Sequence, residues 1–152
     1  MKKVLFVCLG NICRSPVAEG IMLHLVEEND LHKHWKIDSA GTAGYHIGEA
    51  PDHRTIKNAK KNGVDLSHLI ARKFSANDFE DFDHIYVMDE SNYNNVIAHA
   101  ATEEHRKKVD YLLNITHPGK NLPVPDPYYG TEQNFEEVFQ LVYAACSKLA
   151  GL

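Results

Sequence analysis

Two residues near the N-terminus, Cys8 and Arg14, combine a nucleophile with an anion-binding group. Five residues separate them, among them Gly10 and Asn11, which tolerate the backbone angles of a tight turn. If the backbone curls between the two, its N–H groups point inward and bind an anion at the start of a helix. The Arg14 guanidinium then binds two oxygens of that anion, and the positive surroundings favour the thiolate form of Cys8. This spacing predicts a cysteine that attacks a bound phosphoryl group.

A thiolate mechanism of this kind needs a proton donor, and a second loop supplies a candidate. A thiolate cannot protonate a departing alkoxide or phenoxide, so a general acid is required. Asp126 lies between Pro125 and Pro127, which stiffen the backbone and aim the carboxyl group. Ser15 follows Arg14, and its hydroxyl can donate to the Cys8 thiolate and stabilise it as a leaving group. Each signal is weak alone, and together they indicate phosphoryl transfer through cysteine.

The elements that must position these side chains alternate between strands and helices. Apolar and β-prone runs predict strands at residues 4–9, 35–40, 84–88 and 109–113. Amphipathic or capped stretches predict helices at residues 16–28, 53–62, 90–100 and 132–149, with Asp52, Asp89 and Thr131 as N-caps and Gly63 as a stop. The proline-rich segment 116–130 is predicted to be a loop.

This alternation predicts an α/β fold, a single-domain three-layer sandwich over residues 1–152. Its four-stranded parallel sheet is expected to be doubly wound in the flavodoxin-like manner. Ligands bind outside the carboxyl ends of the strands in such sheets, and Cys8 lies at the end of the first predicted strand.

Composition and charge narrow the possible partners. The chain has 152 residues, of which 43% are hydrophobic and 24% charged, as is ordinary for a globular protein. The net charge of −5 argues against nucleic acid, and no apolar run approaches the roughly 20 residues that span a bilayer. The chain has three cysteines and no recognisable secretory signal, and its ten histidines do not have the spacing of zinc ligands. We therefore expect a cytoplasmic protein without a metal, a membrane partner or a nucleic-acid partner.

Over essentially its whole length the chain resembles the low-molecular-weight protein tyrosine phosphatase family. Four segments carry the resemblance in the right order and spacing: residues 7–16 (VCLGNICRSP), 38–42 (DSAGT), 88–92 (MDESN) and 126–130 (DPYYG). The resemblance implies that Cys8 attacks phosphorus while Arg14 and the loop amides hold the phosphoryl oxygens. Asp126 would protonate the tyrosyl oxygen and then activate the water that hydrolyses the phosphocysteine.

The resemblance also assigns the surrounding residues. The substrate-binding set is Leu9, Gly10, Asn11, Ile12, Cys13, Ser15, Tyr45, Tyr128 and Tyr129, in which Leu9, Tyr45 and Tyr128 form pocket walls and Tyr129 the rim. Ser39 and His68 are expected to support the loop. No cofactor is implied. The expected partner is a phosphotyrosine-containing protein or peptide, aryl phosphates are expected substrates, and inorganic phosphate or vanadate-like anions are expected inhibitors of a monomer.

Three other functions fit the same loop less well. A thioredoxin-coupled arsenate reductase of this fold needs further redox cysteines, and none lies between Arg14 and Ala145. A phosphoarginine phosphatase of the same superfamily carries threonine where this chain has Ile12. An inactive phosphate-binding module would bind oxyanions without turnover, although Cys8 and Asp126 are both present. A Cys8–Cys13 disulfide after mild oxidation and phosphorylation of Tyr128 or Tyr129 are regulatory hypotheses that the sequence leaves open.

Overall fold

A four-stranded parallel sheet forms the centre of the computed structural model, which describes residues 1–152. The strands are β1 (Lys2–Cys8), β2 (Trp35–Gly41), β3 (His84–Val87) and β4 (Val109–Tyr111). They lie in the order β2-β1-β3-β4, and every neighbouring pair is parallel. The predicted four-stranded parallel sheet is therefore confirmed.

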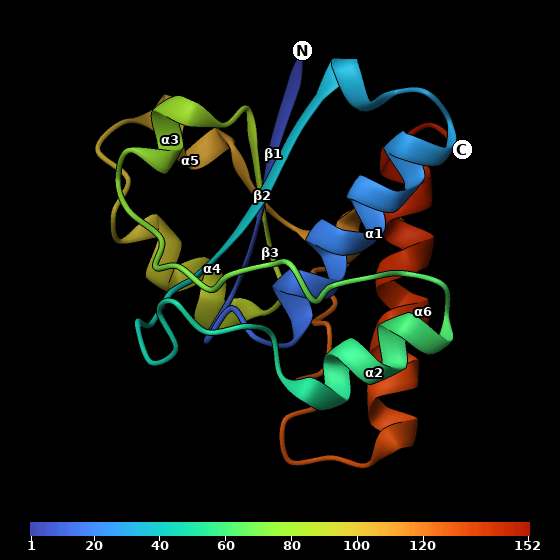
Figure 1. Ribbon diagram of the computed structural model, residues 1–152. Helices are drawn as coiled ribbons and strands as arrows, with labels where there is room; N and C mark the ends of the chain where they lie inside the picture. The colour runs from blue at the N-terminus through green and yellow to red at the C-terminus, as the bar shows by residue number, and fades with distance from the viewer.

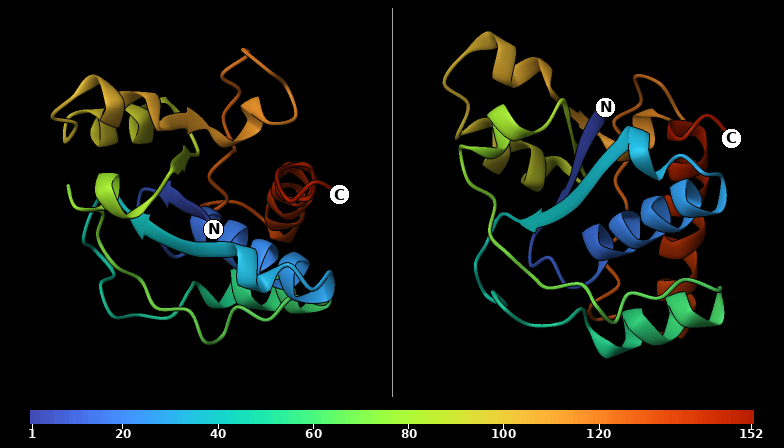
Figure 2. Two further views of the ribbon diagram at one scale, coloured as in Figure 1. Left: turned by 90° about the horizontal axis from the view of Figure 1, so that it is seen from above. Right: turned by 45° about the horizontal axis from the view of Figure 1, so that its top comes forward.

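Helices cover both faces of the sheet. They are α1 (Arg14–Glu28), α2 (His53–Lys61), α3 (Asp78–Asp81), α4 (Glu90–Ile97), α5 (Glu103–Lys107) and α6 (Glu132–Leu149), with short 3₁₀ turns at His32–His34 and Leu112–Asn114. Figures 1 and 2 show α1, α2 and α6 on one side of the sheet and α3, α4 and α5 on the other. This is the predicted three-layer, doubly wound α/β arrangement.

Alternating side chains of β1 divide the core between the two layers. Val4, Phe6 and Cys8 belong to the cluster that packs under α1 and α6, whereas Leu5 and Val7 belong to the cluster on the opposite face. All five side chains are buried, as expected for a central parallel strand. Because successive side chains of a strand point to opposite faces of the sheet, the Cys8 side chain lies on the face that α1 covers.

Most predicted helix ends are found where the sequence places them. The Asp52 carboxylate accepts a hydrogen bond from the Arg54 N–H at the start of α2, and Asp89 accepts one from the Asn92 N–H at the start of α4. Gly63 follows α2 with a φ of 85°, in the left-handed region. At the start of α6, the Thr131 N–H donates to Asn134 Oδ1 at 2.7 Å.

Two predicted elements are shorter than expected. Helix α4 ends at Ile97, and β4 ends at Tyr111 because the chain turns into a 3₁₀ helix. Leu112 and Leu113 in this turn remain buried, so the apolar run continues after the strand has ended. The short helices α3 and α5 were not predicted.

The topology places the end of β1 at a natural binding position. The chain leaves β1 to form β2 on one side and later adds β3 on the other side. The crevice at this switch point lies outside the carboxyl ends of the strands, where Cys8 ends β1. None of the helices has the length and apolar character needed to cross a bilayer.

Candidate active site

The backbone between β1 and α1 forms an anion-binding loop, here called the anion loop (residues 8–14). None of the N–H groups from Leu9 to Ser15 donates a hydrogen bond to an acceptor of the protein. The carbonyl groups point outward instead: Cys8 O accepts from the Thr42 N–H, and Leu9 O from the Ala43 N–H, both at 2.9 Å. A run of free donors at a helix N-terminus is a preformed site for an oxyanion.

Cys8 lies at the base of this loop, and Ser15 holds a hydroxyl beside its sulfur. Cys8 Sγ and Ser15 Oγ are 3.0 Å apart. Ser15 Oγ accepts a hydrogen bond from Asn11 Nδ2 at 2.8 Å, so its own hydrogen remains available to the sulfur. The other acceptor near this hydroxyl, Ala40 O, is 3.5 Å away. The arrangement favours a hydrogen bond from Ser15 to a Cys8 thiolate.

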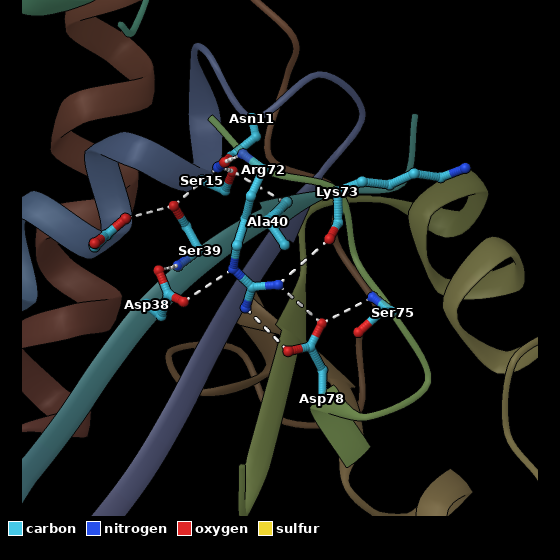
Figure 3. Close-up of polar contacts among 10 residues, drawn as sticks. Asn11, Ser15, Asp38, Ser39, Ala40, Arg72, Lys73, Ser75 and Asp78 are labelled. Carbon is cyan, nitrogen blue, oxygen red and sulfur yellow. Dashed lines mark hydrogen bonds and ion pairs between the residues drawn. The ribbon is translucent and has the colours of Figure 1, made fainter. Parts of the chain in front are cut away.

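Asn11 holds the loop in its curled form. Its φ of 57° lies in the left-handed region, which asparagine tolerates better than most residues. Its side chain makes bonds in three directions: Nδ2 donates to Ser15 Oγ and Ser39 Oγ, both at 2.8 Å, and Oδ1 accepts from the Arg72 N–H at 3.0 Å. Figure 3 shows these contacts. Ser39 was expected to support the loop, and the structure brings it together with Asn11 and Ser15.

Glu19 and Arg72 extend the network away from the loop, and the sequence analysis did not identify them. Ser39 Oγ donates to Glu19 Oε1 at 2.5 Å, and burial raises the pKa of Glu19 to about 7. The Arg72 guanidinium binds Asp38 Oδ2 and Asp78 Oδ1, each at 3.0 Å (Figure 3). The sequence signal for Glu19 was an acidic residue within the apolar part of α1, whereas the partners of Arg72 are distant in the sequence.

The Arg14 guanidinium is buried and its orientation is fixed. Only 3% of its side chain is exposed, and Nη1 donates to Asp89 Oδ2 at 2.7 Å and to Val124 O at 2.9 Å. Nη2 lies 3.6 Å from Asp126 Oδ2, and Nε has no partner. These contacts leave the Nη2–Nε edge available for a bidentate interaction with an oxyanion. Asp89, which the sequence predicted only as a helix cap, therefore also orients Arg14.

A pocket of about 290 Å³ opens above the anion loop. It is lined by Cys8, Leu9, Gly10, Ile12, Cys13, Arg14, Tyr45, His46, Asp126, Tyr128 and Tyr129. The predicted nucleophile, guanidinium, acid and aromatic residues thus lie around one cavity. Tyr129 is 96% exposed and Tyr128 38% exposed, consistent with a rim and a wall. His46 is a lining residue that the sequence analysis missed.

His68 is the one predicted site residue that the structure does not bring to the loop. Its side chain is exposed and lines a different surface pocket, beside His32 and Trp35. Its neighbours Leu66 and Leu69 are buried, which turns His68 outward. The expected support of the loop by His68 is therefore corrected: Asn11 is held by Ser15, Ser39 and Arg72 instead.

The three thiols are free and buried, but their surroundings differ. Burial raises the pKa of Cys13 to about 12, and it raises that of Cys146 as well. Cys13 nevertheless lines the same pocket as Cys8.

Comparison with known proteins agrees with this geometry. Residues 3–151 match the family model described as "Low molecular weight phosphotyrosine protein phosphatase". The human protein of that name is 43% identical over 145 residues, which cover 95% of this chain and 91% of the human one. A crystal structure of a protein tyrosine phosphatase from Entamoeba histolytica, with Hepes in its active site, superimposes with a TM-score of 0.91 at 38% identity, covering 99% of this chain and 95% of that one.

A crystal structure described as DARP, drosophila arginine phosphatase, is also similar. Its TM-score is 0.89 at 34% identity, with 99% of this chain and 96% of that chain covered. The family match spans nearly the whole chain and includes every element that builds the pocket. This chain belongs to the low molecular weight phosphotyrosine protein phosphatase family.

Proposed function

We propose that the chain is a protein-tyrosine phosphatase that hydrolyses phosphotyrosine through a phosphocysteine intermediate on Cys8. The observation that carries this proposal is the set of free N–H groups from Leu9 to Ser15, which surround Cys8 in one pocket with Arg14 and Asp126. A phosphoryl group bound by these donors lies directly against the sulfur. Family membership supports the same reaction.

In the first step, Cys8 Sγ attacks phosphorus and the tyrosyl oxygen departs. The loop amides and the free edge of Arg14 stabilise the charge on the equatorial oxygens in the transition state. Asp126 contacts Arg14 at 3.6 Å across the pocket, so a phosphoryl group bound to Arg14 also approaches the Asp126 carboxyl group. That carboxyl group protonates the leaving oxygen.

In the second step, water attacks the phosphocysteine and releases inorganic phosphate. Asp126 has lost its proton in the first step and now removes one from the water. The sulfur departs as a thiolate, and the Ser15 hydroxyl at 3.0 Å stabilises it. The same donors bind inorganic phosphate and vanadate, so both anions are expected to inhibit competitively.

The walls of the pocket favour an aromatic phosphate ester. Leu9, Tyr45 and Tyr128 line the space above the anion loop, and apolar and aromatic side chains pack well against a phenyl ring. A phosphotyrosine is long enough to reach Cys8 between these walls, whereas a phosphoserine is not. We expect the enzyme to act as a monomer in the cytoplasm, where buried free thiols such as those here are usual.

Phosphoarginine is the second candidate substrate. It is favoured by the similarity to the structure described as an arginine phosphatase from Drosophila. Ile12 argues for phosphotyrosine, because its apolar side chain lines the pocket and offers no hydrogen bond to a guanidinium group. Phosphoarginine phosphatases of the same superfamily are expected to carry threonine at this position.

Steady-state assays on the parent, Cys8→Ser and Asp126→Ala proteins test the proposal. Phosphotyrosine, phosphoserine, phosphoarginine and an aryl phosphate with a good leaving group serve as substrates. Cys8→Ser is expected to lose at least about 10³-fold in kcat. Asp126→Ala should lose about 10²- to 10⁴-fold on phosphotyrosine and less on the activated aryl phosphate, which needs little proton donation.

Two results would contradict this assignment. Full activity of Cys8→Ser would exclude the phosphocysteine, and equal losses of Asp126→Ala on both aryl substrates would exclude Asp126 as the acid. A preference for phosphoarginine over phosphotyrosine would favour the second candidate. Tight phosphate binding without turnover of any substrate would favour an inactive binding module.

A further inference from the structure

The loop that carries Asp126 has few direct connections to the rest of the molecule. Within residues 125–130, the one backbone–backbone hydrogen bond is internal and joins the Gly130 N–H to Pro127 O at 2.8 Å. The Asp126 carboxylate lies 3.6 Å from Arg14 Nη2, and 45% of its side chain is exposed. A general acid must be held within hydrogen-bond reach of the leaving oxygen. Side-chain contacts must therefore hold this loop over the pocket.

The Arg54 guanidinium makes such a contact with the aromatic wall of the pocket. Arg54 lies in the first turn of α2, which packs against α6 (Figure 1). Its Cζ lies 5.4 Å from the centroid of the Tyr128 ring and 4.8 Å from that of the Phe135 ring. A cation within about 6 Å of an aromatic face is attracted to it. Phe135 is buried in α6, so Arg54 connects Tyr128 to a fixed part of the fold.

Asp52 fixes the orientation of Arg54 and connects it to the anion loop. Arg54 Nε donates to Asp52 Oδ1 at 3.0 Å, and Nη2 donates to Oδ2 at 2.8 Å. This bidentate pair holds the planar guanidinium in one orientation. The Asp52 N–H donates to Ile12 O of the anion loop at 2.8 Å. Arg54 is therefore attached to the loop that binds the phosphoryl group.

The connection continues from Tyr128 to the acid. The Tyr128 N–H donates to Asp126 Oδ1 at 3.1 Å, so a displacement of Tyr128 also displaces the carboxyl group. Together with the Asp52–Arg54 pair, this bond completes a series of contacts that runs from the anion loop to the acid. The two ends of the series line the same pocket.

We propose that Arg54 is a positioning residue that holds the Asp126 carboxyl group at the leaving oxygen by binding the Tyr128 ring. This inference rests on the proposed function, in which Asp126 protonates that oxygen. Arg54 is not among the residues that line the catalytic pocket, so it acts through Tyr128 and not on the substrate. Its loss should therefore slow the reaction most where proton donation matters most.

The dependence of kcat/KM on the leaving group provides the test. Phosphotyrosine needs proton donation, whereas an aryl phosphate with a good leaving group needs little. Arg54→Met keeps an apolar side chain beside Phe135 and removes the guanidinium. We expect its kcat/KM to fall about three- to tenfold on phosphotyrosine and by less than about twofold on the activated ester. Arg54→Lys, which keeps a cation without the planar fork, should recover only part of the loss.

Lys57→Met is the matched control for the loss of a positive charge on α2. Lys57 is exposed and does not line the catalytic pocket, so both kcat/KM values should stay within about twofold of the parent. Arg54→Met is also introduced into Asp126→Ala, where no acid remains to be positioned and the further loss on phosphotyrosine should disappear. Equal losses of Arg54→Met on both substrates, or an undiminished further loss in Asp126→Ala, would overturn the inference.

Failure of the proposed function would be seen in different proteins. The parent and Asp126→Ala test the reaction and its acid, whereas Arg54→Met tests the positioning. If the parent hydrolyses neither ester, the proposed function fails, and NMR relaxation of the Tyr128 and Tyr129 amides then decides whether Arg54 holds the loop. Their order parameters should be lower in Arg54→Met than in the parent and in Lys57→Met. Equal order parameters in all three proteins would overturn the inference without reference to activity.

Discussion

A continuous row of hydrogen bonds runs from a buried carboxyl group to the nucleophile. Glu19 accepts from Ser39, and Asn11 donates to both Ser39 and Ser15 (Figure 3). Ser15 in turn lies beside Cys8 Sγ. Both N–H bonds of the Asn11 amide are used, so each serine directs its own hydrogen away from Asn11: Ser39 toward Glu19, and Ser15 toward the sulfur. The role of Glu19 is to fix the far end of this row.

Glu19 also makes the stability of the fold depend on pH. Burial raises the pKa of Glu19 from 4.5 to about 7. Between pH 4.5 and 7 the folded chain therefore keeps a proton on Glu19 that the unfolded chain has lost. The stability that this proton confers is present in full below pH 4.5 and is lost as the pH rises through 7. In Glu19→Gln the side chain stays neutral, so the unfolding free energy of the parent should fall relative to the variant by on the order of 2 kcal/mol from pH 4.5 to 8.

Denaturant unfolding of both proteins at several pH values measures this difference. Glu28→Gln, an exposed position near the end of the same helix, is the matched control and should show no such trend. A constant difference between Glu19→Gln and parent across this range would mean that Glu19 is ionised in the folded chain throughout.

The site residues that the sequence revealed are those whose chemistry is visible within a short segment. Cys8 and Arg14 share one loop, and Asp126 stands between two prolines, so local spacing was sufficient. Arg72 and His46 come to the site through contacts made only in the folded chain, with Asn11 and Gly10 respectively. Local sequence contains no signal for such contacts.

At the scale of elements, the carboxyl end of β2 determines the position of the anion loop. Gly41 ends this strand, and a Cβ there would lie 2.8 Å from Leu9 O and 3.1 Å from the carbonyl carbon of Gly10. Gly41 is also bonded on its other side, where its N–H donates to Arg72 O and its carbonyl accepts from the Phe74 N–H, both at 2.8 Å. The strand therefore cannot move aside to accept a side chain.

Gly41→Ala is accordingly expected to damage activity more than stability. The added Cβ displaces backbone that carries the free N–H groups, and small displacements of binding groups cost much of a rate enhancement. We expect kcat/KM on an aryl phosphate to fall by on the order of 10- to 100-fold. Thermal unfolding and kinetics of the same samples separate the two effects.

Gly20→Ala is the matched control for this prediction. Its Cβ would lie 2.0 Å from Leu66 Cδ2 in the core, away from the loop, so overpacking should destabilise the fold by about 1–3 kcal/mol. Its kcat should remain within about twofold of the parent. A Gly41→Ala protein with unchanged kinetics would show that the loop tolerates the displacement.

Element types were predictable from the sequence, and several element ends were not. A continuous apolar run identified β1, because a buried parallel strand is apolar on both faces. The apolar residues that follow β4 hid its end, since Leu112 and Leu113 are as buried after the strand as Val109 is within it. Helices α3 and α5 are too short to produce a periodic pattern.

On the scale of the whole molecule, the anion loop joins the two halves of the core. Arg14 begins α1 on one face, and its partner Asp89 caps α4 on the other. Arg72 binds the loop through Asn11 and reaches Asp78 at the start of α3. Loss of the loop structure would therefore disconnect elements on both sides of the sheet, so the loop should unfold together with the whole chain.

Binding of an oxyanion to this loop should consequently stabilise the entire fold. A ligand that binds only the folded state at 100 times its Kd adds about 2.7 kcal/mol, which corresponds to a rise in Tm of about 5–10 °C for a chain of this size. Inorganic phosphate is expected to raise the Tm of the parent and of Cys8→Ser alike, because binding does not require the thiolate. Arg14→Met should lose most of this rise, since its remaining donors are backbone N–H groups alone. Potassium chloride at matched ionic strength controls for general salt effects, and the shift must appear in one cooperative transition. An equal rise in Arg14→Met would place the stabilising phosphate outside the anion loop.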